Sequence, residues 1–198
     1  MIQNLFDGVL SGSILSLGAI GLTMVMHTLR FANFSHAELL AIGAYAALVF
    51  AKLFDLLVPA LSQTMGRLSL TISLIFSIVI AMGITGASAI VIDRFVFRRI
   101  RETAGPLSMV FASFGVALIV RNIISLIFGL KSKLYNDEIA FAVVLSTDPL
   151  ILIKPDQVFV LFIAILIMLV FHFVLSHTHY GYALKAVSEN PTLAQVNG

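Results

Sequence analysis

The chain has 198 residues, of which 60% are hydrophobic and only 11% charged, a balance that excludes a soluble globular domain. It contains no cysteine, which excludes disulfide bonds and thiolate metal sites, and its net charge of +2 is too dispersed for a nucleic-acid surface. Several runs reach the charge-free length of about 20 residues that identifies a membrane span. We therefore expect an all-α polytopic membrane protein, a helical bundle in a lipid bilayer.

Five apolar runs predict five transmembrane helices within one membrane domain. We place them at about residues 6–26, 37–57, 68–92, 106–130 and 157–176. The first run lacks the basic start of a cleaved signal peptide, so we expect it to remain as a span. Small residues recur at helical spacing in the first two runs, where they favour close helix packing over ligand binding. They are Gly8 and Gly12, and then Gly43, Ala47 and Ala51.

A polar stretch interrupts the apolar sequence where the second helix should begin. It contains Asn33, Ser35, His36 and Glu38. Only thirteen uncharged residues separate Glu38 from Lys52, about 20 Å of helix, whereas the hydrocarbon core is about 30 Å thick. A lysine side chain snorkels to the interface, but a glutamate reaches much less far. We therefore expect this stretch to face a cavity at or near membrane depth and to line the path of a substrate.

A second interpretation of the same stretch needs no substrate. Asn33 or Ser35 would cap the second helix, with Glu38 in its first turn, where a negative charge favours the helix dipole. Both interpretations remain open, because a capping residue can also line a pathway.

A basic cluster follows the third run and sets the expected topology. Arg94, Arg98, Arg99 and Arg101 lie within eight residues. Such a cluster directly after a span marks the cytoplasmic side. The N-terminus and residues 131–156, with Asp137 and Asp148, are then outside, and residue 198 is inside. Within residues 131–156, two short apolar runs around a turn indicate a hairpin-like element.

Arg121 is the charged residue inside the fourth helix. It lies fifteen residues after Pro106, about 22 Å along the helix, in the outer half of the bilayer. Either it snorkels outward, or it pairs with an acid in the bundle and belongs to the substrate path.

Three segments resemble the permease subunits of bacterial branched-chain amino acid ABC importers. NFSHAELLAIGAY is similar to the family's N-F-A-H-G-E-x-x-x-x-G-A-Y, and PLSMVFASFGVALIVRNIISLIFG resembles its fourth-helix pattern. HYGYALKAVSENPTLAQVNG resembles its cytoplasmic coupling segment, G-x-A-x-R-A-x-A-E-N-x-x-x-A-x-x-x-G. Ala37 stands where the family usually has glycine, and the chain stops at Gly198, within the coupling segment. We therefore expect an incomplete permease, as a fragment or as a truncated subunit.

The resemblance implies the partners of an ATP-driven importer in the bacterial inner membrane. These are a second permease subunit, homologous or identical, two cytoplasmic ATPase subunits and an extracytoplasmic substrate-binding protein. The substrate would be a branched-chain or other small amino acid. ATP and Mg would bind to the partner ATPases, since no Walker A pattern occurs here. We expect no catalytic residue, metal site or cofactor in this chain.

The segment 177–198 is expected to be the cytoplasmic coupling segment. Small residues would keep it slim enough to enter a cleft in an ATPase, and Asn190-Pro191 is typical of a capped helix start. The expected coupling residues are Gly181, Ala183, Lys185, Glu189, Asn190 and Pro191.

Other functions compete with this interpretation. Close relatives in the family carry urea or short amides. An ion channel or secondary carrier could use Glu38 and Arg121 as a charge relay, but it would not need an ATPase-docking segment. An intramembrane enzyme is disfavoured, because no His/Glu metal spacing or Ser/Lys pair falls on adjacent helix faces.

Overall fold

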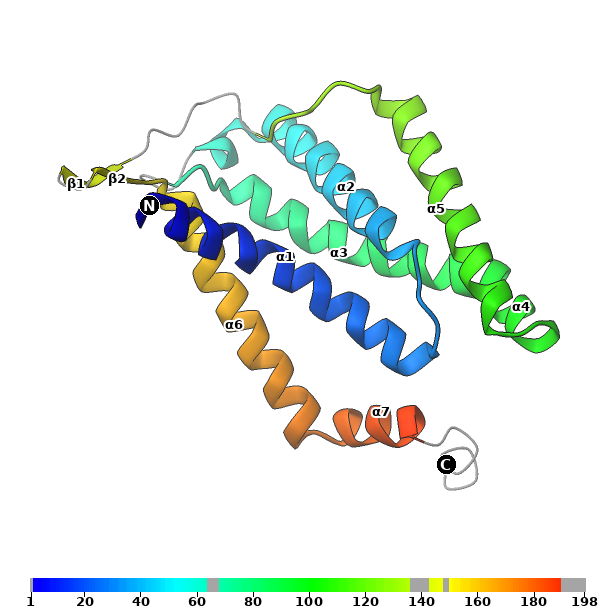
Figure 1. The fold of residues 1–198 in the computed structure, drawn as a ribbon. Helices are drawn as coiled ribbons and strands as arrows, with labels where there is room; N and C mark the ends of the chain where they lie inside the picture. Colours follow the sequence, from blue (N-terminus) through cyan, green and yellow to red (C-terminus); the bar gives the residue numbers. More distant parts are fainter. Residues whose placement is uncertain (1, 64–67, 136–142, 148–149, 190–198) are drawn as a thin grey trace. The chain divides into compact units, whose positions relative to one another are not determined.

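The computed structural model describes residues 2–63, 68–135, 143–147 and 150–189. Figure 1 shows the elements in chain order: α1 (Ile2–Leu29), α2 (His36–Leu57), a 3-10 turn (Pro59–Ser62), α3 (Ile72–Ile92), a π-helical turn (Asp93–Phe97), α4 (Arg98–Thr103), α5 (Pro106–Phe128), strands β1 (Val143–Thr147) and β2 (Leu150–Ile153), α6 (Pro155–His177) and α7 (His179–Glu189). Among these described residues, five helices are long and apolar enough to cross a membrane, with α3 continuing through the π-helical turn into α4. The predicted fold class, an all-α polytopic bundle, is confirmed.

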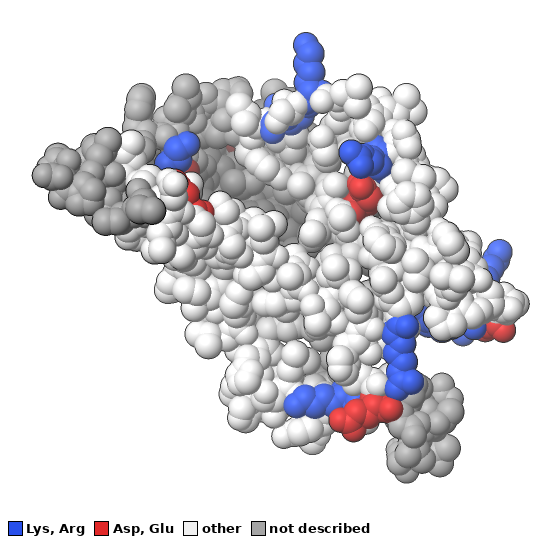
Figure 2. Space-filling model, in the orientation of Figure 1, with Lys and Arg blue, Asp and Glu red and all other residues white. Residues whose placement is uncertain are grey.

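The long helices expose apolar side chains over most of their surface. Leu15 of α1, Val79 of α3 and Phe111 of α5 are 73%, 64% and 67% exposed. Figure 2 shows charged side chains at only a few places on a largely uncharged surface. Hydrocarbon solvates such side chains and water does not, so these faces suit contact with lipid or with other apolar helices.

The chain folds as two compact units, residues 1–32 with 142–198 and residues 33–141, each described by itself. In the first unit α1 packs along α6 and also contacts α7 and β2. The strands β1 and β2 pair antiparallel, with Val143 opposite Ile153 and Thr147 opposite Leu150. This pair is the hairpin-like element expected within residues 131–156.

In the second unit α2 packs against α3 through small residues. Ala47 and Ala51 are buried, and the expected small face of this helix, with Gly43, is confirmed. The facing residues of α3 repeat every four positions and are also small: Ser73, Ser77, Ala81 and Thr85. Small side chains on both helices let the backbones approach closely.

The glycines of α1 do not show the packing predicted for them. A Cβ atom on Gly8 or Gly12 would meet none of the described atoms within 4 Å. Their spacing therefore serves no helix contact within the part of the chain that the structure describes.

Candidate functional site

The polar turn before α2 is held together by its own side chains. Asn33 and Ser35 are only 6% and 1% exposed. The Asn33 Oδ1 accepts hydrogen bonds from the Ser35 backbone N–H at 3.1 Å and from the Ser35 hydroxyl at 2.6 Å. This local pairing satisfies the Asn33 side-chain oxygen and the Ser35 hydroxyl without a ligand. Asn33 and Ser35 thus shape the turn, and their expected place in a substrate path stays a prediction.

The turn is also fixed to α5. The backbone N–H of Phe34 donates to the hydroxyl of Ser113 at 3.1 Å, and Ser113 is fully buried. The Phe34 ring meets the Phe114 ring edge to face, with centroids 6.3 Å apart. These contacts set where α2 begins relative to α5.

His36 and Glu38 have polar side-chain atoms for which the described residues provide no partner. Both are half-buried in the first turn of α2. The His36 Nε2 is buried and has no hydrogen-bond partner among the described residues. Glu38 forms no ion pair with any described residue. Since an unpaired buried polar atom is costly, these two side chains are the best candidates for contact with a ligand, water or partner chain.

The structure agrees with only part of the interpretation that these residues cap α2. Glu38 does lie in the first turn of α2, and Ser35 occupies the N-cap position. However, the Ser35 side chain accepts no hydrogen bond from the helix backbone, because Ser35 has helical φ and ψ and its hydroxyl is bonded to Asn33.

Arg121 lies apart from this turn along α5. It is exposed and forms no hydrogen bond or ion pair with the described residues. Eight residues separate it from Ser113, about 12 Å of helix. Within the described residues, nothing pairs Arg121 with an acid, and its assignment to the substrate path remains a prediction.

The expected coupling segment begins as a helix at a sharp corner after α6. The Thr178 hydroxyl donates to the Val174 carbonyl oxygen at 2.6 Å, at the end of α6. The same hydroxyl accepts from the backbone N–H of Gly181 at 3.2 Å, in the first turn of α7. One side chain therefore satisfies backbone groups of both helices at the corner.

The close approach of the α6 backbone at this corner requires a glycine at position 181. Gly181 is buried, and a Cβ atom there would collide with the carbonyl oxygen of Leu175 and lie 2.6 Å from that of Val174. The resemblance predicts a small residue here so that the segment can enter a partner, whereas the structure shows that the chain's own backbone excludes a larger residue.

The two faces of α7 differ in what they contact. Tyr180, Ala183 and Val187 are exposed and follow helical spacing, and Tyr180 is 80% exposed. Glu189 is also exposed, at the end of the helix. Asn190 and Pro191, the remaining expected coupling residues, lie outside the described residues.

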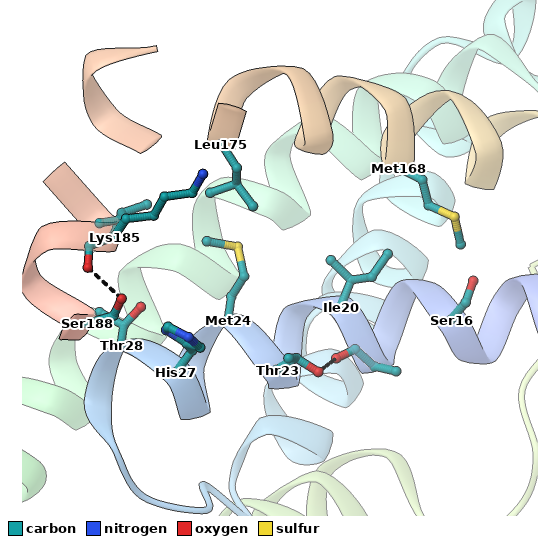
Figure 3. Close-up of a pocket in the computed structure, with 12 residues that line it drawn as sticks. Ser16, Ile20, Thr23, Met24, His27, Thr28, Met168, Leu175, Lys185 and Ser188 are labelled. Atoms are coloured by element: carbon teal, nitrogen blue, oxygen red, sulfur yellow. Dashed lines mark hydrogen bonds between the residues drawn. The ribbon is translucent and has the colours of Figure 1, made fainter. Parts of the chain in front are cut away.

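The opposite face of α7 borders a groove of about 520 Å³ between α1, α6 and α7, drawn in Figure 3. Its lining is mainly apolar, with a few polar groups: Ser16, Ala19, Ile20, Thr23, Met24, His27, Thr28, Met168, Leu175, Leu184, Lys185 and Ser188. Lys185, an expected coupling residue, thus belongs to this inner face, whereas Ala183 belongs to the outer one.

Both ends of α1 are hydrogen-bonded to other elements of its unit by residues that no sequence pattern singles out. The guanidinium of Arg30 donates to the carbonyl oxygens of Ser188 and Glu189 at 2.8 and 2.9 Å. At the other end, the side-chain amide of Gln3 donates to the Leu152 carbonyl oxygen and accepts from the Leu152 N–H, both at 3.0 Å.

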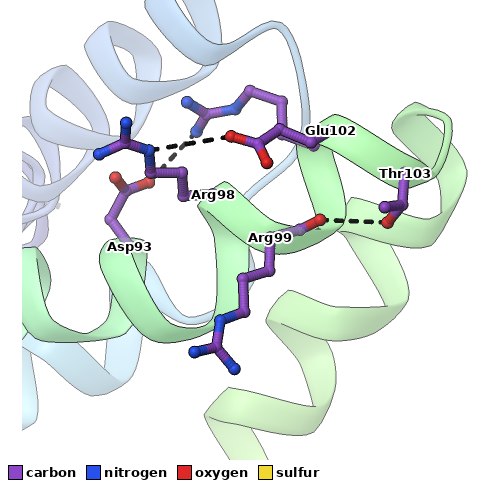
Figure 4. Close-up of polar contacts among 6 residues, drawn as sticks. Asp93, Arg98, Arg99, Glu102 and Thr103 are labelled. Atoms are coloured by element: carbon purple, nitrogen blue, oxygen red, sulfur yellow. Dashed lines mark hydrogen bonds and ion pairs between the residues drawn. The ribbon is translucent and has the colours of Figure 1, made fainter.

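The basic cluster after α3 is partly balanced by acids. Arg101 lies 3.2 Å from Asp93, and Arg98 lies 3.9 Å from Glu102 (Figure 4). The Arg99 side chain points away from these pairs. Because the pairs are largely exposed, each contributes about 1 kcal/mol or less. The described residues hold no group of three potential metal ligands.

Residues 4–198 match the family model described as "Branched-chain amino acid transport system / permease component". The chain belongs to this permease family. It is 27% identical over 201 residues to the high-affinity branched-chain amino acid transport system permease protein LivH of Escherichia coli (strain K12). It is 24% identical over 199 residues to the corresponding protein BraD of Pseudomonas aeruginosa. No solved structure matches the chain.

The alignments also define how much of a family member this permease chain represents. All of it aligns with LivH and BraD, but it spans only 62% of the length of each. A probable LivH from Methanocaldococcus jannaschii is 26% identical over 192 residues, which is 96% of this chain and 56% of the relative. Membership in a permease family, together with five apolar helices among the described residues, makes the chain part of a multi-pass membrane protein.

Proposed function

We propose that this chain forms part of the permease of an ATP-driven importer for branched-chain or other small amino acids. It would pair with a second permease subunit, homologous or identical, two cytoplasmic ATPases that bind ATP and Mg, and an extracytoplasmic substrate-binding protein. The match over residues 4–198 to a branched-chain amino acid permease family carries this proposal.

The outer face of α7 supports contact with an ATPase. Tyr180, Ala183 and Val187 expose an apolar stripe on a helix that directly follows the last apolar span. An apolar stripe at this spacing suits insertion into a groove of a partner protein. The Thr178 corner and the Arg30 guanidinium hold the two ends of α7, so a push on this helix is passed to α6 and α1 rather than absorbed by a loose tail.

The first turn of α2 supports a place in the substrate path. His36 carries a buried, unpartnered nitrogen and Glu38 an unpaired carboxylate at the end of an apolar helix. A carboxylate and an imidazole suit the ammonium group of an amino acid, which needs acceptors. In this proposal Asn33 and Ser35 hold the turn in shape, and Arg121 lies farther along the path.

The hairpin of β1 and β2 supports docking of the binding protein. By the expected topology it lies outside, N-terminal to α6. The acidic residues Asp137 and Glu138, also expected on this side, lie outside the described residues.

Uptake into vesicles tests the proposal. Vesicles would contain the complete complex, built with the full-length permease, with ATP and Mg enclosed in the lumen, on the ATPase side, and the loaded binding protein added outside. We expect labelled leucine to accumulate in the lumen only when ATP, Mg and the binding protein are all present. A complex whose ATPases bind but do not hydrolyse ATP is the control, and it should give no uptake.

The same assay separates the alternatives. Strong competition by urea or acetamide, and none by isoleucine or valine, would transfer the chain to an importer of urea or short amides. Flux that persists without ATP would instead indicate a channel or a secondary carrier.

A further inference from the structure

Helix α1 is bonded at its two ends to elements that the proposed function places on opposite sides of the membrane. Near its start, Gln3 is bonded to Leu152 of β2, 149 positions along the chain. Just after its end, Arg30 is bonded to Ser188 and Glu189 of α7, 158 and 159 positions along. The helix has 28 residues, about 42 Å, which exceeds the hydrocarbon thickness of about 30 Å.

The contact at Arg30 fits the end of a helix. The last carbonyl groups of α7 have no partner within the helix, and the C-terminal end carries partial negative charge. The guanidinium satisfies two of these carbonyls at once, with charge-assisted hydrogen bonds. Arg30 itself has φ of +57°, the left-handed conformation that ends α1 and turns the chain toward Asn33. The residue thus joins the end of α1 to the end of α7.

The contact at Gln3 resembles the pairing of a neighbouring strand. Its amide donates to the carbonyl oxygen and accepts from the N–H of the same residue, Leu152. It also donates to the carboxylate of Asp7, one turn later in α1, at 3.1 Å. The Gln3 side chain is therefore held in place from its own helix while it binds the strand.

Two helices consequently connect the hairpin with α7. The first is α6, which follows β2 and precedes α7 in the chain. The second is α1, bonded at Gln3 and Arg30. With α6 alone, α7 could pivot about the Thr178 corner. With α1 also connected, a displacement of the hairpin must move the C-terminal end of α7, where Arg30 is bound, as well as the Thr178 corner.

We propose that α1 transmits the docking of the binding protein to α7, with Gln3 and Arg30 as the positioning residues at its ends. The inference rests on the proposed function, which supplies the binding protein and the ATPases. It adds the route between them. Rigid elements bonded at discrete points are the kind of structure through which coupling between distant sites passes.

The test uses the complete reconstituted complex and measures ATP hydrolysis with and without the leucine-loaded binding protein. The variants are Gln3→Ala, Arg30→Gly and the two combined. Glycine accepts the positive φ, so Arg30→Gly removes the guanidinium without straining the turn. We expect each single variant to lower the stimulation by about tenfold, within the usual range of coupling between sites, and to leave basal hydrolysis unchanged.

The combined variant distinguishes one shared route from two local effects. If both residues act through α1, the connection through α1 is already broken in either single variant. The combined variant should then lose no more stimulation of ATP hydrolysis than the weaker of the two single variants. Losses that multiply would mean independent local effects and would overturn the inference. Arg30→Lys keeps a positive charge at the end of α7 and should restore part of the stimulation.

Two control variants are matched to these substitutions, one on the same helix α1 and one at another arginine. Thr23 of α1 donates only to the Ala19 carbonyl of its own helix, so Thr23→Ala should keep full stimulation. Arg99→Ala removes an arginine without an ion pair among the described residues and should behave likewise. A wild-type complex that ignores the binding protein would overturn the proposed function itself. A responsive wild type with fully responsive Gln3→Ala and Arg30→Gly variants would overturn only the inference.

Discussion

Gly43 of α2 faces Thr85 of α3 so closely that a Cβ atom on the glycine would lie 2.8 Å from the threonine Oγ1. Cβ contacts are essentially never that short, so with a larger residue either the Thr85 hydroxyl must turn away, which breaks its hydrogen bond to the Ala81 carbonyl oxygen, or the two helices must separate. The position lies in the most extensive helix contact of its unit. The small size of Gly43 lets α2, which carries the polar turn at its start, pack close to Thr85 of α3.

Replacing Gly43 by alanine should therefore destabilise the protein. We expect Gly43→Ala to lower the free energy of unfolding by about 1–3 kcal/mol, the usual cost of overpacking. Gly86→Ala is the matched control, because a Cβ atom there meets none of the described atoms within 4 Å. Thr85→Ala removes the obstructing hydroxyl and should rescue Gly43→Ala. Thermal unfolding in detergent checks all three, and equal losses for Gly43→Ala and Gly86→Ala would contradict the contact.

Glu38→Gln separates a substrate-path residue from a helix cap. Because the carboxylate forms no ion pair with the described residues, removing its charge should leave thermal stability nearly unchanged. Uptake should fall at least tenfold if the carboxylate receives the substrate ammonium group. Both quantities are measured on one preparation of the complete complex. A stability loss of about 1 kcal/mol with normal uptake would favour the cap.

Cross-linking distinguishes the two faces of α7. In this cysteine-free chain, Ala183→Cys and Tyr180→Cys place thiols on the exposed face, whereas Leu184→Cys places one toward α1 and α6. With a bifunctional thiol reagent, we expect Ala183→Cys and Tyr180→Cys to cross-link to an ATPase subunit. We expect Leu184→Cys not to cross-link. Cross-linking at residue 184 alone would mean that the opposite face meets the partner.

Thiol labelling checks the membrane orientation. The basic cluster after α3 predicts that Arg99→Cys faces the cytoplasm and Lys133→Cys the exterior. An impermeant reagent added to intact cells should label residue 133 and not residue 99. The reverse pattern would invert the orientation and exchange the proposed docking faces.

Tyr135 gives a pH-dependent signal. Its hydroxyl donates to the Ala44 carbonyl oxygen at 2.7 Å, and burial raises its pKa above the ordinary value of 10.0. Its contribution to stability is thus complete below pH 10 and is lost as the pH rises through the folded pKa, because the unfolded chain releases the proton first. The phenolate absorbance, taken as the difference between wild type and Tyr135→Phe, should appear above pH 10. A midpoint at or below pH 10 would show that the ring is solvated.

The helices were predictable because membrane spans are long and apolar. Thus Pro106 marks the start of α5 in the sequence and begins it in the structure. The hairpin followed from two apolar runs around a turn. The small face of α2 was predictable from Ala47 and Ala51, since spacing alone places them together. All of these features depend on residues close to one another in the chain.

The polar contacts were less predictable, because they depend on how helices distant in sequence meet. The sequence placed Asn33 and Ser35 in a ligand site, but it could not show that the Asn33 side-chain oxygen accepts hydrogen bonds from Ser35. Arg30 was a lone cation after an apolar run and Gln3 a polar residue near the terminus. Their partners lie about 150 positions away and are brought near only when α1 packs along α6. The spacing of Gly8 and Gly12 was misleading in the opposite way, because it predicted a helix contact that the described residues do not make.

The hydroxyl groups between α2 and α3 determine how these helices can move. Ser77 and Thr85 donate to carbonyl oxygens of their own helix, at 2.6 and 2.8 Å. Among the described residues, one hydrogen bond joins the two helices, from Ser73 to Asp55 at 2.6 Å, near the end of α2 and the start of α3. A tilt about that bond would break no other hydrogen bond between the two helices, because along the rest of their length they touch only by van der Waals contact. Such a tilt would move most at the opposite end, where α2 begins, and it must either carry α5 along or break the hydrogen bond from Phe34 to Ser113.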